Sequence, residues 1–282
     1  MKTKSKIWLG VGAFVVVGTG PTSVAGLRAA ETASGLSTLP GLITDTAIPR
    51  MGSGHIVVAQ HADHGKEAGK EAGEGGEAKG LANLPPELAF AARIALLRGH
   101  LLIGDELVKL QQWNAALPHF LHPGEEIYGD IKDQLAGYKV PPFDASLKVL
   151  SDLVKAKKGG NDYTKALKAV NDALAAADAG MKPKQGNWPG FVVEAAVEAL
   201  KAATGEYQQA IVGGRIAKPV EYQDARGFVW QADRMIESVA ADLQKKDAAA
   251  LDEMRAGLAA LKKAFPSPTP PRAPVKDKGN AC

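Results

Sequence analysis

The chain has 282 residues, a formal net charge of +3 and one cysteine, Cys282, at its last position. A single cysteine excludes an intramolecular disulfide, so the fold has to depend on its hydrophobic core. The nearly balanced charge, without a long basic stripe or interleaved aromatic residues, does not indicate a nucleic-acid partner.

The first 25 residues have the layout of a secretory signal peptide. A basic segment, residues 1–6, precedes an apolar run at residues 7–18, and Ser23 and Ala25 form a small-residue cleavage site. The apolar run is shorter than the about 20 residues that a transmembrane helix needs, and an uncleaved anchor is the alternative. We expect cleavage near Ala25 and an exported, periplasmic protein with no membrane span after signal removal.

Two further segments have the composition of disordered chain. Residues 26–82 are rich in Ala, Gly, Ser, Thr, Glu and Lys, and residues 65–74 repeat a Gly-Lys-Glu-Ala pattern. Such a spacer buries too little apolar surface to offset the entropy lost on ordering. Residues 266–282 are rich in proline and should form an extended tail. One folded domain, residues 83–265, remains between the disordered spacer and the disordered tail.

Helical periodicity dominates this domain, because apolar residues recur at intervals of three and four. Clear runs are Leu167, Val170 and Leu174, and Leu251, Met254, Leu258 and Leu261. Abundant alanine favours helix, and proline and glycine positions divide the chain into short segments. The first helix should follow Pro85-Pro86 and run to about Gln112. The sequence predicts an all-α fold, either an antiparallel helical bundle or stacked helical hairpins of about eight helices.

One helical hairpin has the spacing of a tetratricopeptide repeat. The small and large positions match at Gly104, Leu107, Ala116 and Phe120. Such repeats normally need about three copies for stability, and the match covers one. It nevertheless provides an alternative function, a helical scaffold or protein-interaction module without a metal.

The six histidines fall into two groups. The spacer contains His55, His61 and His64, and the predicted domain contains His100, His119 and His122. His61 and His64 could bind a transition metal loosely, and a polar disordered tract is the alternative for them.

The domain histidines lie near two glutamates. If the first helix turns back near residues 112–114, His100 and Glu125 lie at the same level of an antiparallel pair. We therefore predict that His100, His122 and Glu125 or Glu126 converge. Imidazole and carboxylate groups suit iron, zinc, copper or manganese. Alternatively, the histidines cap helix ends and the glutamates favour a helix N-terminus through the helix dipole.

A second polar cluster lies on either side of a glycine turn. Glu206 and Asp224 are about equally far from the turn, so they could face one another across a helical hairpin. Glu221 and Asp224 are three residues apart, on one helical face. A solvated face is the alternative; if the carboxylates are buried, they need partners, for which Arg215, Arg226 and Arg234 are candidates.

Two segments resemble known families. His122-Pro123-Gly124-Glu125, followed by Tyr128, is similar to the His-x-x-Glu motif of imelysin-like periplasmic proteins. Residues 205–216 and 221–228 resemble the extracytoplasmic helical segment of some bacterial iron permeases. Both families are exported, helical and linked to iron uptake, so the resemblance implies iron handling.

Catalytic motifs are lacking in the sequence. It contains no Ser-centred nucleophile elbow, no His-Glu-x-x-His and no Gly-rich phosphate loop. We therefore expect a non-enzymatic envelope protein that binds a divalent metal such as iron, zinc or copper. The predicted ligands are His100, His122, Glu125 and Glu126, and the expected partners are the metal ion or another envelope protein.

Overall fold

The computed structural model describes residues 80–275, which are mostly α-helical, and this confirms the predicted all-α fold. The predicted signal peptide, the predicted spacer up to residue 79 and the tail residues 276–282 lie outside the described residues. Among the helices that the structure describes, none combines the length and the apolar character that crossing a membrane requires.

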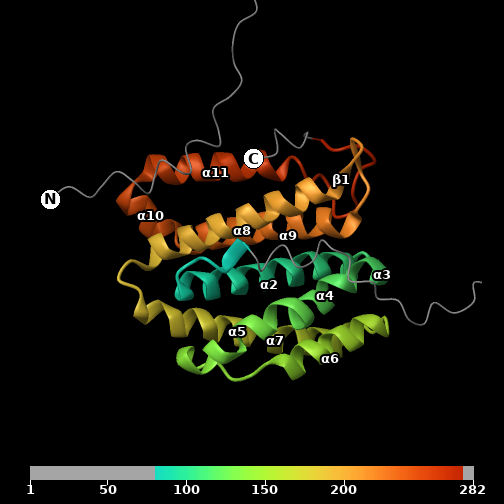
Figure 1. Ribbon diagram of the computed structural model, residues 1–282, viewed down its shortest axis with the longest axis horizontal. Coiled ribbons are helices and arrows are strands. Elements are labelled where there is room, and N and C mark those ends of the chain that lie inside the picture. Colours follow the sequence, from blue (N-terminus) through green and yellow to red (C-terminus); the bar gives the residue numbers. More distant parts are fainter. Residues whose placement is uncertain (1–79, 276–282) are drawn as a thin grey trace, which may run out of the picture. The chain divides into compact units, whose positions relative to one another are not determined.

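The helices follow one another through short connections (Figure 1). In chain order they are α2 (Pro86–Lys109), α3 (Trp113–Ala116), α4 (Pro118–His122), the π-helix η2 (Pro123–Ile127), α5 (Tyr128–Leu135), the 3-10 helix η3 (Ala136–Tyr138), α6 (Asp144–Lys155), α7 (Gly160–Met181), the 3-10 helix η4 (Lys182–Lys184), α8 (Trp188–Ala210), α9 (Pro219–Ser238), α10 (Ala240–Lys246) and α11 (Ala248–Lys262).

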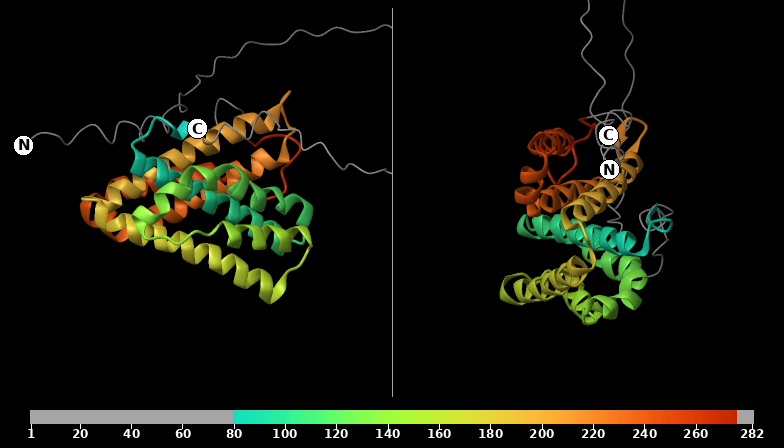
Figure 2. Two further views of the ribbon diagram at one scale, coloured as in Figure 1. Left: turned by 60° about the horizontal axis from the view of Figure 1, so that its bottom comes forward. Right: turned by 90° about the vertical axis from the view of Figure 1, so that its left-hand side faces the viewer.

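Helix α2 lies in the middle of the described helices. In Figures 1 and 2, α8 to α11 lie on one side of α2, and α5 to α7 lie on the other. Pro86 occupies its first turn, where a missing N–H costs no intrahelical hydrogen bond. Most side chains from Ala89 to Val108 are buried, as expected for a helix that has neighbouring helices on more than one side.

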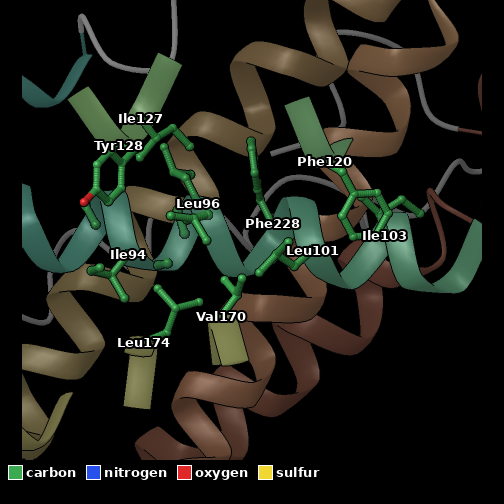
Figure 3. Close-up of a cluster of buried hydrophobic side chains, with 14 of the residues drawn as sticks. Ile94, Leu96, Leu101, Ile103, Phe120, Ile127, Tyr128, Val170, Leu174 and Phe228 are labelled. Atoms are coloured by element: carbon green, nitrogen blue, oxygen red, sulfur yellow. The ribbon is translucent and has the colours of Figure 1, made fainter. Parts of the chain in front are cut away.

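The core is continuous around α2. Figure 3 shows Ile94, Leu96, Leu101 and Ile103 of α2 among side chains that other helices contribute. These partners include Phe228 of α9, Phe120 of α4, Val170 and Leu174 of α7, and Ile127 and Tyr128 of η2 and α5. Burial of these side chains is the main source of stability, since the chain has no disulfide.

Helices α8 and α9 form a hairpin through two very short strands, β1 (Ile211–Val212) and β2 (Arg215–Ile216). The strands pair antiparallel, with Ile211 opposite Ile216. Gly213 and Gly214 connect them with φ values of 58° and 73°, which suit a tight turn that only glycine adopts readily. The turn predicted at these glycines is therefore present, and a two-residue strand lies on either side of it.

Two glycine contacts bring neighbouring helices close to α2. A Cβ atom on Gly227 of α9 would lie less than 3.0 Å from the carbonyl oxygen of Gly99 on α2. A Cβ atom on Gly104 would lie 2.6 Å from the ring of Phe120 on α4. The absence of side chains at these glycines thus sets the distance from α2 to α9 and from α2 to α4.

The chain after α11 contains no helix up to residue 275, but its first residues pack against α9. Phe265 is buried among Tyr207, Tyr222 and Trp230. Three side chains of α9 donate hydrogen bonds to carbonyl oxygens of this segment: Arg226 Nη1 to Phe265 (2.7 Å), Tyr222 Oη to Ser267 (2.9 Å) and Gln223 Nε2 to Pro268 (3.1 Å). Residues 266–268, the start of the tail for which disorder is expected, therefore have a defined place on α9 beside Phe265.

Candidate metal centre

Three histidines surround one carboxylate in the interior of the domain. His100 lies on α2, His119 and His122 lie on α4, and Asp224 lies on α9. The exposed fractions of these four residues are 0%, 0%, 7% and 2%. Polar side chains that are so well buried need partners, and every buried side-chain nitrogen or oxygen in the described part of the chain has one.

The glycine contacts explain why these residues meet. His100 follows Gly99, and Asp224 lies one helical turn before Gly227, so both are next to the point where α2 and α9 are closest. His119 and His122 are three residues apart, which places them on one face of α4. Phe120, packed on Gly104, holds that helix against α2.

One carboxylate oxygen joins two of the rings. Asp224 Oδ1 lies 2.7 Å from Nδ1 of His100 and 2.7 Å from Nδ1 of His119. The other oxygen, Oδ2, lies 3.7 Å from Nδ1 of His122. Each of the three rings therefore has its Nδ1 atom directed at the same carboxylate.

The electrostatics of this group favour an ionised carboxylate. Burial of the Asp224 carboxyl acts to raise its pKa, but the charges of His100 and His119 and their hydrogen bonds hold that pKa well below its usual range. Burial, together with the charge of His100, lowers the pKa of His122 from 6.5 to about 4. At neutral pH the centre thus contains a carboxylate and a neutral His122 imidazole, which are the forms that bind metal ions.

Gln223 provides a further contact to the same group. Its Nε2 donates to the carbonyl oxygen of Pro268 at 3.1 Å, and its Oε1 lies 3.0 Å from Nε2 of His119. His119 is therefore in contact with Asp224 through one ring nitrogen and with Gln223 through the other.

The donor atoms fit a small divalent cation. One ligand atom each from His100, His122 and Asp224 can be chosen so that all lie within 4.8 Å of one another. Ligands on opposite sides of a zinc-sized ion, at about 2.0–2.1 Å each, are at most about 4.2 Å apart. Side-chain movements of less than about 1 Å would therefore bring the three atoms to bonding distance.

The structure brings together two of the four residues predicted as ligands. His100 and His122 belong to the three-residue group, as their spacing about the turn predicts. Glu125 is exposed and Glu126 is partly exposed on η2, and neither belongs to that group. Asp224 from α9 is the carboxylate next to the histidines instead.

The sequence contained one signal for this position of Asp224. Asp224 lies four residues before Phe228, and residues that far apart share a helical face. Apolar residues such as Phe228 mark the core-facing side of an amphipathic helix, so Asp224 belongs on the buried face. Glu206 and Glu221, which the sequence grouped with Asp224, are also buried, but Glu206 accepts a hydrogen bond from Gln209 and Glu221 pairs with Lys218.

A cavity of about 570 Å³ lies elsewhere in the domain. Residues of α2, α7, α8 and α9 line it, and none of His100, His119, His122 and Asp224 is among them. Arg98 and Asp178 at its wall hold one another by two hydrogen bonds, at 3.1 and 2.7 Å. The cavity and the histidine centre are therefore separate features.

Comparison with known proteins gives one match. Residues 182–280 match the model of the iron permease-associated 4-helix bundle domain. No curated protein and no solved structure matches the chain. The matched residues contain α8, α9, α10 and α11, and hence Asp224 and Gln223, whereas the three histidines of the centre precede them. The match supports the resemblance to the helical segment of iron permeases, and the resemblance to imelysin-like proteins stays a prediction.

Proposed function

We propose that this protein binds a divalent transition metal between α2, α4 and α9, with His100, His122 and Asp224 as ligands. The observation that carries the proposal is the convergence of three metal-binding side chains from three helices in a buried position. Solvated acidic groups on a surface often gather without a metal, but burying such a set is costly unless its members are paired or bind a cation.

Iron is the metal that the match favours. The matched domain is described as iron permease-associated, and two imidazoles with one carboxylate are a donor set that suits Fe²⁺. The same set accepts zinc and copper, so the choice of metal in the cell depends on supply as well as on affinity. We propose that the protein holds or passes on iron and performs no catalysis of its own.

The test is a calorimetric titration of Fe²⁺ under anaerobic conditions, and of Zn²⁺ and Cu²⁺, into the full chain and its variants. We expect Asp224→Asn and His122→Ala to remove tight binding with little change in helix content. Glu125→Gln is the matched control, because it changes an exposed carboxylate on η2 that the structure places outside the group. We expect its affinity to equal that of the unaltered chain.

Two results would contradict the proposal. The first is equal binding by the unaltered chain and by Asp224→Asn, and the second is loss of binding in Glu125→Gln alone. If the unaltered chain bound no metal, the scaffold interpretation with its tetratricopeptide-like spacing would be the better account of the fold.

We also propose export, on the sequence of the first 25 residues. N-terminal sequencing of the protein from the cell envelope should give a first residue near Gly26. Recovery of an intact Met1 in the envelope fraction would instead indicate an anchored protein.

A further inference from the structure

We propose that His119 is a fourth ligand of this metal, and that Gln223 and the backbone of Pro268 fix the orientation of its ring. This inference rests on the metal site proposed above. Three protein ligands leave one coordination position of the metal open. With His119 the site has four protein ligands, three imidazoles and one carboxylate, and no open position.

The first observation is the position of His119 Nδ1. It lies 2.7 Å from Asp224 Oδ1, the same oxygen that His100 Nδ1 approaches at 2.7 Å. The His119 side chain is completely buried, so no water on the surface competes for this nitrogen. Edges of a tetrahedron with metal–ligand distances near 2.0 Å are about 3.3 Å long, so Asp224 Oδ1 has to separate from each of these two nitrogens by about 0.6 Å. His119 lies outside the group whose ligand atoms are within 4.8 Å of one another, and its ring centre is 6.3 Å from that of His100 and 6.4 Å from that of His122. Its side chain therefore also has to turn toward the ion.

The second observation fixes the hydrogen on the other ring nitrogen. A carbonyl oxygen can only accept, so the 3.1 Å contact between Pro268 and Gln223 requires the amide Nε2 of Gln223 to face Pro268. The amide oxygen of Gln223 then faces His119 Nε2 at 3.0 Å, and that nitrogen must donate. With Nε2 donating to Gln223, Nδ1 is the ring nitrogen of His119 that remains for a metal ion.

This arrangement is the usual one for a histidine ligand. Metal-binding histidines commonly donate their second N–H to an oxygen, which selects the tautomer and orients the ring. Gln223 is thus a positioning residue, and it acts through His119.

Pro268 is part of the segment that packs on α9 after Phe265. It is buried, and its neighbour Ser267 accepts a hydrogen bond from Tyr222. The segment therefore keeps the Pro268 carbonyl in a constant place relative to Gln223, and the chain beyond α11 contributes to the metal centre without providing a ligand.

A closed four-ligand site has a functional consequence. Catalytic metal sites retain a position for water or substrate, whereas sites in which four protein atoms surround the ion hold it without reacting. The fourth ligand therefore favours retention or transport of the metal over chemistry at it.

Cobalt tests which groups bind the metal, because four-coordinate Co²⁺ absorbs visible light strongly and its spectrum changes when one ligand is exchanged for another. We would titrate Co²⁺ into the full chain and into His100→Ala, His119→Ala, Gln223→Leu and Gln223→Glu, recording affinity and spectrum. The unaltered chain should give the intense spectrum of a four-coordinate site. His119→Ala should bind Co²⁺ more weakly and with a shifted absorption spectrum, since water replaces the imidazole as the fourth ligand.

Two substitutions of Gln223 distinguish a role in orienting the His119 ring from a role in folding. Gln223→Leu keeps the size of the side chain but removes the acceptor for His119, and we expect affinity to fall about 10–100-fold. Gln223→Glu keeps an oxygen for His119 Nε2, so it should bind more tightly than Gln223→Leu and recover the spectrum of the unaltered chain. Neither effect follows from a purely structural role, which would not change the spectrum of bound cobalt.

The outcomes distinguish this inference from the function on which it rests. If the unaltered chain binds no Co²⁺, the metal site itself fails. If it binds Co²⁺ and His100→Ala loses binding, while His119→Ala keeps the same affinity and spectrum, the three-ligand site stands and His119 is overturned as a ligand. If His119→Ala does not fold, equal spectra for Gln223→Leu and the unaltered chain overturn the proposal.

Discussion

The backbones of α2 and α9 touch where Gly227 meets Gly99: a Cβ atom on Gly227 would lie less than 3.0 Å from the Gly99 carbonyl oxygen. A backbone oxygen cannot rotate away as the end of a side chain can. We therefore expect Gly227→Ala to push the helices apart, destabilise the domain by about 1–3 kcal/mol and weaken metal binding. Urea unfolding and metal titration of the same variant measure both effects.

Gly205→Ala is the control for this substitution. Gly205 lies in α8, and a Cβ atom there would meet nothing within 4 Å. Alanine is the better helix former, so we expect stability to rise by up to about 1 kcal/mol with metal affinity unchanged. A similar loss of stability in both alanine variants would show that the α2–α9 contact has no special importance.

Arg226 holds the segment after α11 in place. Its guanidinium group binds the carboxylate of Glu106 at 2.8 and 3.1 Å and donates to the Phe265 carbonyl at 2.7 Å. The Arg226 side chain is only 8% exposed, so removing it should cost about 3 kcal/mol. We expect Arg226→Ala to lower the urea midpoint and to make residues after Phe265 sensitive to protease.

A second arginine serves as the comparison for Arg226. Arg255 binds Glu237 with two hydrogen bonds of 2.7 Å, but both side chains are more than 40% exposed. Water and salt screen such surface pairs, so Arg255→Ala should hardly change the midpoint. If both alanine variants behaved alike, burial would not be what makes the Arg226 contact important.

Tyr222 should make the domain sensitive to alkali. Burial raises the pKa of Tyr222 to about 12 from 10.0, so the unfolded chain loses this proton first as the pH rises. The contribution of the neutral phenol is complete below pH 10 and disappears between pH 10 and 12, up to about 3 kcal/mol. The free energy of unfolding of Tyr222→Phe should therefore not show this part of the decrease at alkaline pH.

The measurement for Tyr222 is the difference in free energy of unfolding between the two proteins at several pH values. At neutral pH, Tyr222→Phe should be less stable by about 1 kcal/mol, because the hydrogen bond to Ser267 is lost. The difference should shrink or change sign above pH 10. A constant difference up to pH 12 would contradict the raised pKa.

The helices could be predicted because each has a local cause in the sequence. Pro86 begins α2, and the apolar spacing of Val170 and Leu174 places both on the buried face of α7. Spacing about the turn between α2 and α4 put His100 level with Glu125, and from this the convergence of His100 and His122 could be predicted. The glycines of the α8–α9 connection likewise predicted its turn.

The carboxylate of the centre depends on a packing that local spacing does not contain. Asp224 meets His100 because two glycines let α2 and α9 approach. Periodicity shows which face of a helix is buried, but it does not show which other helix packs on that face. Glu125 was the nearer carboxylate in sequence, but the π-helix after His122 leaves it exposed. The hydrogen bond from Gln223 to Pro268 joins residues 45 positions apart, for which the proline-rich composition gave no indication.

The separation of the centre's residues along the chain sets the order of events during biogenesis. His100 and His119 are 124 and 105 positions from Asp224, so no short stretch of nascent chain contains the whole donor set. The ion-binding geometry appears only after the first and last thirds of the domain have associated. The proposed export implies that the polypeptide crosses a membrane in an unfolded state. The ion would then come from the compartment where folding finishes, and the metal content of the cytoplasm would not decide which metal is bound.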